Sequence, residues 1–223
     1  MSVLADRLAS IQGSIADAAR DSGRHPNEIT TIVVTKFQPA ALVAELAALG
    51  VQDVGENRHQ EAQAKAAQLA SLGLRWHFVG QLQAKKAKQV RAYASAIHSV
   101  DRPSLVEALR SDEATIDCFV QVNLTEDPAR GGIGPDGLDD LVELVLGTPG
   151  LRLRGLMGVA PLGEPARPAF ARMRLLSERV RRTAPDAASL SMGMSHDFRE
   201  AILEGATHLR IGTAITGNRP DAG

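Results

Sequence analysis

Short apolar runs alternate with helix-like segments along almost the whole chain, and this alternation limits the possible folds more than any other feature. Runs of this kind, rich in Val, Ile and Leu, recur eight times, and a segment with helical periodicity or with helix-end Pro and Gly follows each of the first seven. Alternation of this type predicts parallel strands joined by right-handed crossovers. The runs are residues 30–34, 51–55, 75–80, 96–100, 116–123, 151–160, 189–195 and 208–212.

Eight strand–helix units are the number that closes a barrel, so we expect an α/β fold with one TIM-type (β/α)8 barrel. An open doubly wound sheet is the alternative, but no G-x-G-x-x-G sequence follows the first run. Leu4, Leu8, Ile11 and Ile15 recur at helical spacing before the first strand. We therefore expect one domain over residues 1–223, with an extra N-terminal helix at 1–24 and the barrel at 30–217.

Composition and charge limit the cell compartment and the binding partners that we expect for this chain. The net charge is −1, so no general basic field would attract nucleic acid or an anionic membrane. The single cysteine, Cys118, excludes an internal disulfide and any multi-cysteine metal site; in its apolar run a buried core thiol is expected. No apolar run approaches the ~20 residues of a membrane span, and the first residues lack the pattern of a signal peptide. We expect a cytoplasmic protein without bound metal.

Lys36 directly follows the apolar run 30–34, at the barrel end where active sites lie. Surroundings of low dielectric would favour its neutral, nucleophilic amine. The alternative is a lysine whose ammonium group reaches solvent at the barrel rim.

An anion site is expected after the last two strands. Ser195 is expected to be the N-cap of a helix that starts near His196 or Asp197. Gly212 and Thr213 follow the last strand and open another helical turn. Backbone N–H groups at such turns, together with hydroxyl groups, bind phosphate, and barrels commonly hold phosphate after strands seven and eight. Ordinary capping explains each motif alone but explains their pairing less well.

Several other features carry weaker signals. His77 and His98 lie inside predicted strands and are expected to be core residues or to support a site. The helix near 83–93 carries Lys85, Lys86, Lys88 and Arg91, for which a solvated face is expected before an anion-binding one. The glycine-rich loop at 125–136 is either a ligand-covering loop or a plain surface loop.

Beyond these patterns, the chain resembles the pyridoxal phosphate homeostasis proteins, which are similar to the barrel domain of alanine racemase standing alone. The resemblance runs from about residue 30 to 217 and is most specific in its last two motifs. The matching segments are VVTKFQP, VGENRHQE, WHFVGQLQAKK, QVNLTEDPARGGI, RGLMGVAP, LSMGMSHDF and THLRIGTAITG.

This resemblance implies that the chain binds pyridoxal 5′-phosphate (PLP), a form of vitamin B6, as a Schiff base on Lys36. By the same resemblance Ser195, Gly212 and Thr213 hold the phosphate, Arg210 faces the pyridine nitrogen and Asn57 lies near the ring. The chain departs from the family pattern at Gln38, Lys85, Arg130 and Thr216, which puts in doubt a role for a second lysine in passing the cofactor on.

The implied function is that of a carrier in intracellular PLP homeostasis, not of an enzyme, with apo PLP-dependent enzymes as recipients and the chain acting as a monomer. An arginine opposite the ring nitrogen weakens the ring as an electron sink. The racemase takes its second base, a tyrosine, from a further domain for which this chain has no room, and the one tyrosine here, Tyr93, lies away from the expected barrel mouth. The alternatives are a slow PLP-dependent amino-acid racemase or lyase, and a phosphosugar enzyme that uses Lys36 without PLP.

Overall fold

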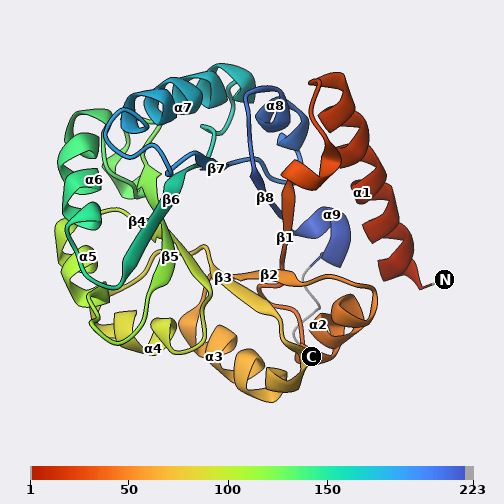
Figure 1. Cartoon of the computed structure of the whole chain (residues 1–223). Coiled ribbons are helices and arrows are strands. Elements are labelled where there is room, and N and C mark those ends of the chain that lie inside the picture. Colours follow the sequence, from red (N-terminus) through yellow and green to blue (C-terminus); the bar gives the residue numbers. More distant parts are fainter. Residues whose placement is uncertain (1, 219–223) are drawn as a thin grey trace.

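The structure, a computed structural model, describes residues 2–218. Its strands pair in chain order, all in parallel, and β1 also pairs with β8, which closes the barrel (Figure 1). The predicted TIM-type barrel is therefore confirmed, and the open sheet is excluded. The strands are β1 (Thr30–Val34), β2 (Asp53–Glu56), β3 (Arg75–Phe78), β4 (Ala96–Val100), β5 (Ile116–Val122), β6 (Leu151–Gly158), β7 (Ser189–Ser191) and β8 (His208–Ile211).

Helices surround the barrel, and the extra N-terminal helix α1 packs outside it against α8 and α9 (Figure 1). The α-helices are α1 (Val3–Asp21), α2 (Ala40–Ala48), α3 (His59–Gln68), α4 (Ala87–Arg91), α5 (Pro103–Leu109), α6 (Leu138–Leu146), α7 (Ala166–Val180), α8 (Phe198–Leu203) and α9 (Thr213–Thr216). Short 3-10 turns are η1 (Pro26–Glu28), η2 (Ala70–Leu72), η3 (Ala84–Lys86), η4 (Pro128–Arg130) and η5 (Pro135–Gly137).

The main difference from the expected elements is β7, which ends at Ser191 although its apolar pattern continues to residue 195. The chain bends at Gly193, whose φ of 93° lies in the left-handed region that favours glycine. A Cβ at this position would lie 2.6 Å from the Cβ of Ala201 in α8. The bend therefore lets α8 pack closely on the strand and carries residues 194 and 195 out of the sheet.

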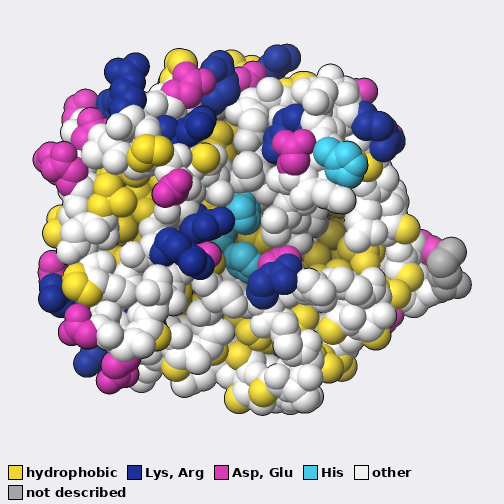
Figure 2. All heavy atoms as spheres, in the orientation of Figure 1, with side chains coloured by type: hydrophobic (Ala, Val, Ile, Leu, Met, Phe, Trp, Pro, Cys, Tyr) yellow, Lys and Arg dark blue, Asp and Glu magenta, His cyan; other side chains and the backbone are white. Residues whose placement is uncertain are grey.

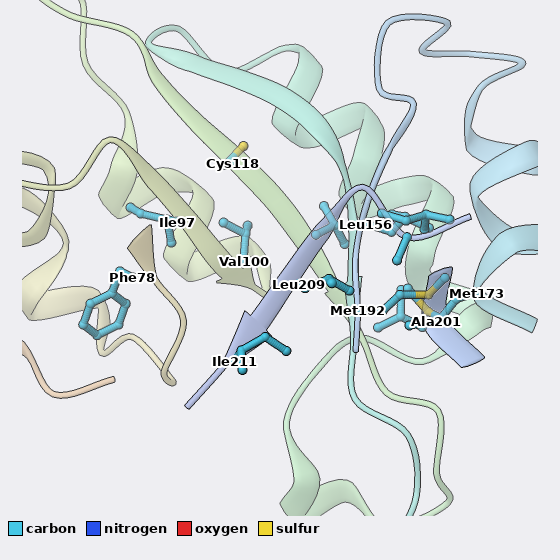
Figure 3. Close-up of a cluster of buried hydrophobic side chains, with 14 of the residues drawn as sticks. Phe78, Ile97, Val100, Cys118, Leu156, Met173, Met192, Ala201, Leu209 and Ile211 are labelled. Atoms are coloured by element: carbon cyan, nitrogen blue, oxygen red, sulfur yellow. The ribbon is translucent and has the colours of Figure 1, made fainter. Parts of the chain in front are cut away.

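The aliphatic core fills the layer between the strands and the surrounding helices. Figure 3 shows one part of it, where Leu156 of β6, Met192 after β7 and Leu209 of β8 meet Met173 of α7 and Ala201 of α8. All five are fully or almost fully buried. Burial of a side chain the size of Leu or Met is worth about 1.5–3 kcal/mol each, so this layer fixes the helices on the barrel.

Cys118 of β5 belongs to the same core, as expected. It is fully buried, and this burial raises the pKa of its thiol to about 12. Within residues 2–218, no helix combines the length and apolar character needed to cross a bilayer, and no group of three His, Cys, Asp or Glu side chains could hold a metal ion.

Candidate functional site

A cavity of about 320 Å³ opens where the C-terminal ends of β1, β6 and β8 meet the loops after β2, β3 and β7. All six residues expected to bind the cofactor line this one cavity, although they are spread over 178 positions of the chain. The lining consists of Val34, Lys36, Asn57, Val79, Gly80, Met157, Val159, Met194, Ser195, His196, Arg210, Gly212 and Thr213.

Lys36 lies in the turn after β1, at the edge of the cavity, and its side chain is exposed. Of the two environments considered for Lys36, the structure shows the one in which the lysine reaches solvent at the barrel rim. Directly after Lys36 the turn passes through Phe37, whose φ of 65° lies in the left-handed region. The N–H of Phe37 donates to Glu61 Oε2 of α3 at 3.2 Å, which holds this turn in place.

Ser195 lines the cavity, but it is not the N-cap of α8, so this expectation is also wrong. Asp197 occupies the N-cap position, and its Oδ1 accepts a hydrogen bond from the N–H of Met194 at 2.6 Å. The carboxylate closes a tight turn over residues 194–197 that delays the helix to Phe198. The Ser195 hydroxyl is thereby left facing α9, where its Oγ accepts from the N–H of Ala214 at 3.4 Å.

Gly212 and Thr213 form the start of α9, as the sequence predicts. The first N–H groups of a helix have no acceptor within that helix, so such a turn can bind an anion. A Cβ added to Gly212 would meet Val34 Cβ at 3.7 Å, an ordinary contact. Packing against the protein therefore does not require glycine at this position on the cavity wall.

Asn57 follows β2 and lies against the loop after β3. Its side-chain Oδ1 is buried and has no hydrogen-bond partner within the described part of the chain. A Cβ on Gly80 would lie 2.7 Å from Asn57 Cα and closer still to its carbonyl oxygen, so only glycine allows the two loops to approach this closely. A buried, unpaired acceptor at a cavity wall is costly unless a ligand or water pairs with it.

Arg210 of β8 places a buried cation at the cavity, since only 5% of the residue is exposed. Its Nη1 donates to Ser191 Oγ at 2.8 Å and its Nη2 to the carbonyl oxygen of Gly158 at 2.9 Å. Burial lowers the pKa of Arg210 to about 10, although the charge of Asp197 raises it. The guanidinium group is therefore charged at neutral pH and held by two neutral oxygen atoms.

A buried ion pair beneath the Lys36 turn was not anticipated from the sequence. Lys65 Nζ of α3 donates to Glu56 Oε1 at 2.7 Å and to the carbonyl oxygen of Thr35 at 2.8 Å. The Thr35 hydroxyl donates to the same carboxylate oxygen at 2.7 Å. Ala62 and Ala66 mark the buried face of α3, and Lys65 lies on the same face. This position on the helix is the sequence feature from which a buried lysine could have been predicted.

The weaker candidates lie outside the cavity. His77 and His98 are buried inside the barrel, as expected of core residues. Tyr93 lies outside the cavity lining, with its hydroxyl 3.5 Å from His59 Nδ1. In the basic cluster, Arg91 is not part of a solvated face, because its Nη1 donates to the carbonyl oxygen of Leu109 at 2.8 Å.

The loop at 125–136 folds back onto the end of β5. The N–H of Ile133 donates to the carbonyl oxygen of Gln121 at 2.8 Å, and the N–H of Asn123 donates to that of Ile133 at 2.9 Å. Among the described residues of this loop, none lines the cavity.

Comparison with known proteins agrees with this architecture. The family model of the alanine racemase N-terminal domain matches residues 20–220. The pyridoxal phosphate homeostasis protein of Pseudomonas aeruginosa is 40% identical over 98% of this chain and 97% of its own length. That of Escherichia coli is 35% identical over 98% of both chains.

Comparison with solved structures gives the same barrel fold. The structure of PipY from Synechococcus elongatus with PLP bound has a TM-score of 0.83 and 35% identity, and the match covers 96% of this chain and all of PipY. Alanine racemase from Corynebacterium glutamicum has a TM-score of 0.70 at 16% identity, over 97% of this chain and 62% of the racemase, which shows a shared barrel fold. From its sequence and its fold, the chain belongs to the alanine racemase N-terminal domain family and, within it, to the pyridoxal phosphate homeostasis proteins.

Proposed function

We propose that this chain binds PLP in the cavity at the C-terminal end of the barrel, as a Schiff base on Lys36, and acts as a carrier in PLP homeostasis. One observation carries the proposal: Lys36, Asn57, Ser195, Arg210, Gly212 and Thr213 all line the same cavity. The PLP-bound structure of PipY, a relative at 35% identity, supports it.

The chemistry of the cavity fits the aldehyde and the phosphate of PLP. When bound, PLP supplies an aldehyde that condenses with an amine, losing water as a C=N bond forms. Lys36 supplies that amine, and the turn formed by Gly212 and Thr213, with the Ser195 hydroxyl, supplies donors for the phosphate. The unpaired Oδ1 of Asn57 supplies an acceptor.

Arg210 favours a carrier over an enzyme. A guanidinium group donates hydrogen bonds but does not give up its proton. An arginine opposite the pyridine nitrogen therefore leaves that nitrogen unprotonated, whereas a carboxylic acid would protonate it. The one tyrosine of the sequence, Tyr93, is not among the described residues that line the cavity, so it is not placed to serve as a second base.

The exposure of Lys36 gives the carrier a route for release. Water and free amines can reach an exposed lysine, so the bond that tethers the cofactor stays open to hydrolysis and exchange. An enzyme that protects a reactive carbanion excludes water from its site instead. We therefore propose that apo PLP-dependent enzymes receive the cofactor from this protein, acting as a monomer in the cytoplasm.

Titration of the purified protein with PLP, followed by absorbance, tests cofactor binding. Wild type and Lys88→Ala, a change at an exposed lysine of α4, should develop the Schiff-base band, and Lys36→Ala should not. A wild type that stays colourless with excess PLP would overturn the proposal and would favour a phosphosugar enzyme. A band that persists in Lys36→Ala would contradict the assigned lysine.

Two further assays separate a carrier from an enzyme. Incubation of the loaded protein with an apo PLP-dependent enzyme should restore that enzyme's activity, while loaded protein without the apo-enzyme keeps its band. Incubation with L-amino acids in D₂O should produce no deuterium at Cα at enzyme-like turnover. Steady exchange would instead support the slow racemase or lyase.

A further inference from the structure

A continuous chain of hydrogen bonds crosses the barrel interior and ends at Arg210. Starting from the cavity, Arg210 Nη1 donates to Ser191 Oγ (2.8 Å), and Ser191 Oγ lies 2.8 Å from His98 Nδ1. His98 Nε2 lies 2.9 Å from His77 Nδ1, and His77 Nε2 lies 2.9 Å from Asp53 Oδ1. The five side chains come from β8, β7, β4, β3 and β2, so this series of hydrogen bonds connects five strands.

The far end of this chain reaches the opposite face of the barrel, at the N-terminal ends of the strands. Figure 2 shows that face, with histidine side chains at the base of a central hollow and charged side chains around its rim. Asp53, at the start of β2, also pairs with Arg75 at the start of β3, 2.5 Å apart. The series of hydrogen bonds therefore begins at a surface ion pair and ends at the cavity.

The two ends and His98 limit the possible directions of the hydrogen bonds. Arg210 can only donate, and an ionised Asp53 can only accept. Burial would raise the pKa of Asp53, but hydrogen bonds from His77 and Arg75 lower it to about 2, so the carboxylate is ionised. Burial holds the pKa of His98 well below its usual value, so this imidazole is neutral and has one donor and one acceptor.

With one proton on each of the two imidazoles, a single arrangement satisfies every contact. Arg210 donates to Ser191, and the Ser191 hydroxyl donates to His98 Nδ1. His98 then carries its proton on Nε2 and donates to His77 Nδ1, and His77 carries its proton on Nε2 and donates to Asp53. Dipoles that align in this way strengthen one another in a medium of low dielectric. Ser191 and His98 are fully buried, so water does not compete with this order.

We propose that Asp53, His77, His98 and Ser191 are positioning residues that fix the orientation of the Arg210 guanidinium at the cavity. Of the two terminal nitrogen atoms of Arg210, one donates to Ser191 in this series of hydrogen bonds and the other donates to the carbonyl oxygen of Gly158. The restriction of Arg210 is a property of the protein alone. Its consequence for cofactor affinity rests on the proposed function.

The matched variants are Ser191→Ala, which removes the acceptor for Arg210, and Ser191→Thr, which keeps the hydroxyl group. Ser99→Ala is the control, because Ser99 is equally buried, neighbours His98 in β4 and has no hydrogen-bond partner for its Oγ within the described residues. Circular dichroism and urea unfolding establish that each variant is folded.

Nitrogen-15 NMR of the cofactor-free protein at pH 8 tests the proposal directly. In wild type, His98 should be neutral with its proton on Nε2, and the Arg210 side chain should give separate Nη signals because its rotation is restricted. Ser99→Ala and Ser191→Thr should match wild type, whereas Ser191→Ala should average the Arg210 signals. A His98 proton on Nδ1, or Arg210 signals that are the same in wild type and Ser191→Ala, would overturn the proposal.

The affinity for PLP provides a second measurement, and it separates failure of the positioning role from failure of the proposed function. Ser191→Ala should raise the dissociation constant for PLP roughly tenfold, the size expected for one lost hydrogen bond to a charged group, and Ser99→Ala should not. An unchanged affinity in Ser191→Ala would contradict the positioning role. If wild type binds no PLP while the NMR signals are as predicted, the proposed function fails and the ordering of Arg210 stands.

Discussion

Gly80 faces the backbone of Asn57 so closely that a Cβ on Gly80 would lie 2.7 Å from Asn57 Cα. Real Cβ atoms essentially never approach another atom within 3.0 Å. This contact sets the distance between the loops after β2 and β3, and both residues line the cavity. A glycine in one motif thus positions an asparagine in another.

The first prediction concerns this contact. Gly80→Ala should push the Asn57 loop away, lower the affinity for PLP at least tenfold and destabilise the fold by about 1–3 kcal/mol, as overpacking does. Gly134→Ala is the control, because a Cβ there meets nothing within 4 Å. PLP titration and urea unfolding measure the two effects. Wild-type affinity in Gly80→Ala would contradict the account of this loop pair.

The second prediction concerns the buried pair under the Lys36 turn. Lys65→Met should destabilise the protein by about 3–5 kcal/mol, because Glu56, only 1% exposed, loses its cation. Burial already raises the pKa of Glu56, and removal of Lys65 raises it further. A group with a raised folded pKa is stabilising when protonated, so the loss should be smaller at pH 6 than at pH 8.

Urea unfolding at the two pH values measures this effect, and Lys88→Met on the exposed face of α4 provides the control. An equal loss at both pH values would show that Glu56 does not become protonated in the variant. Stability equal to that of wild type would show that the ion pair is dispensable.

The third prediction concerns the pH dependence of stability. Burial lowers the pKa of His208 to about 4, against a usual value of 6.5. The unfolded chain therefore binds a proton that the folded chain excludes, and stability falls as the pH falls from 6.5 to 4, by about 3 kcal/mol for this residue. His98, whose pKa is also lowered, acts in the same direction.

The free energy of unfolding, measured between pH 7.5 and 4.5, should decrease less in His208→Leu than in wild type. His196→Leu is the control because His196 is exposed. A slope in His208→Leu that equals the wild-type slope would exclude His208 as a source of the pH dependence.

The fourth prediction compares two glycines of the N-terminal segment. Gly13 lies within α1, and a Cβ there meets nothing within 4 Å, so Gly13→Ala should stabilise the protein by about 0.5–1 kcal/mol. Gly23 follows α1 with a φ of 70°, so Gly23→Ala should destabilise it. Thermal unfolding should give opposite signs, and equal signs would contradict the boundary of α1.

The sequence was sufficient to predict the barrel because each strand–helix unit carries its own local pattern. Periodicity also indicated that Lys36, Asn57 and Arg210 follow or end strands, so that they share one end of the barrel. It could not predict the left-handed φ of Phe37 in the turn that carries Lys36, because phenylalanine seldom adopts that conformation.

Contacts across the barrel could not be predicted from the sequence either. His98 and Ser191 are 93 positions apart and meet only because β4 and β7 direct these side chains into the same interior space. The apolar pattern of 189–195 likewise gave no sign of the bend at Gly193, which ends β7 early and moves Ser195 away from the N-cap of α8.

Borohydride reduction of the PLP-loaded protein, followed by peptide mass spectrometry, shows which lysine carries the cofactor. Reduction turns the C=N bond into a stable amine, so the modified lysine can be read from the peptide map. We predict one phosphopyridoxyl group per chain, on Lys36, in a protein whose band is bleached. A label on Lys65, Lys85, Lys86 or Lys88 with Lys36 unmodified, or no label at all, would contradict the account.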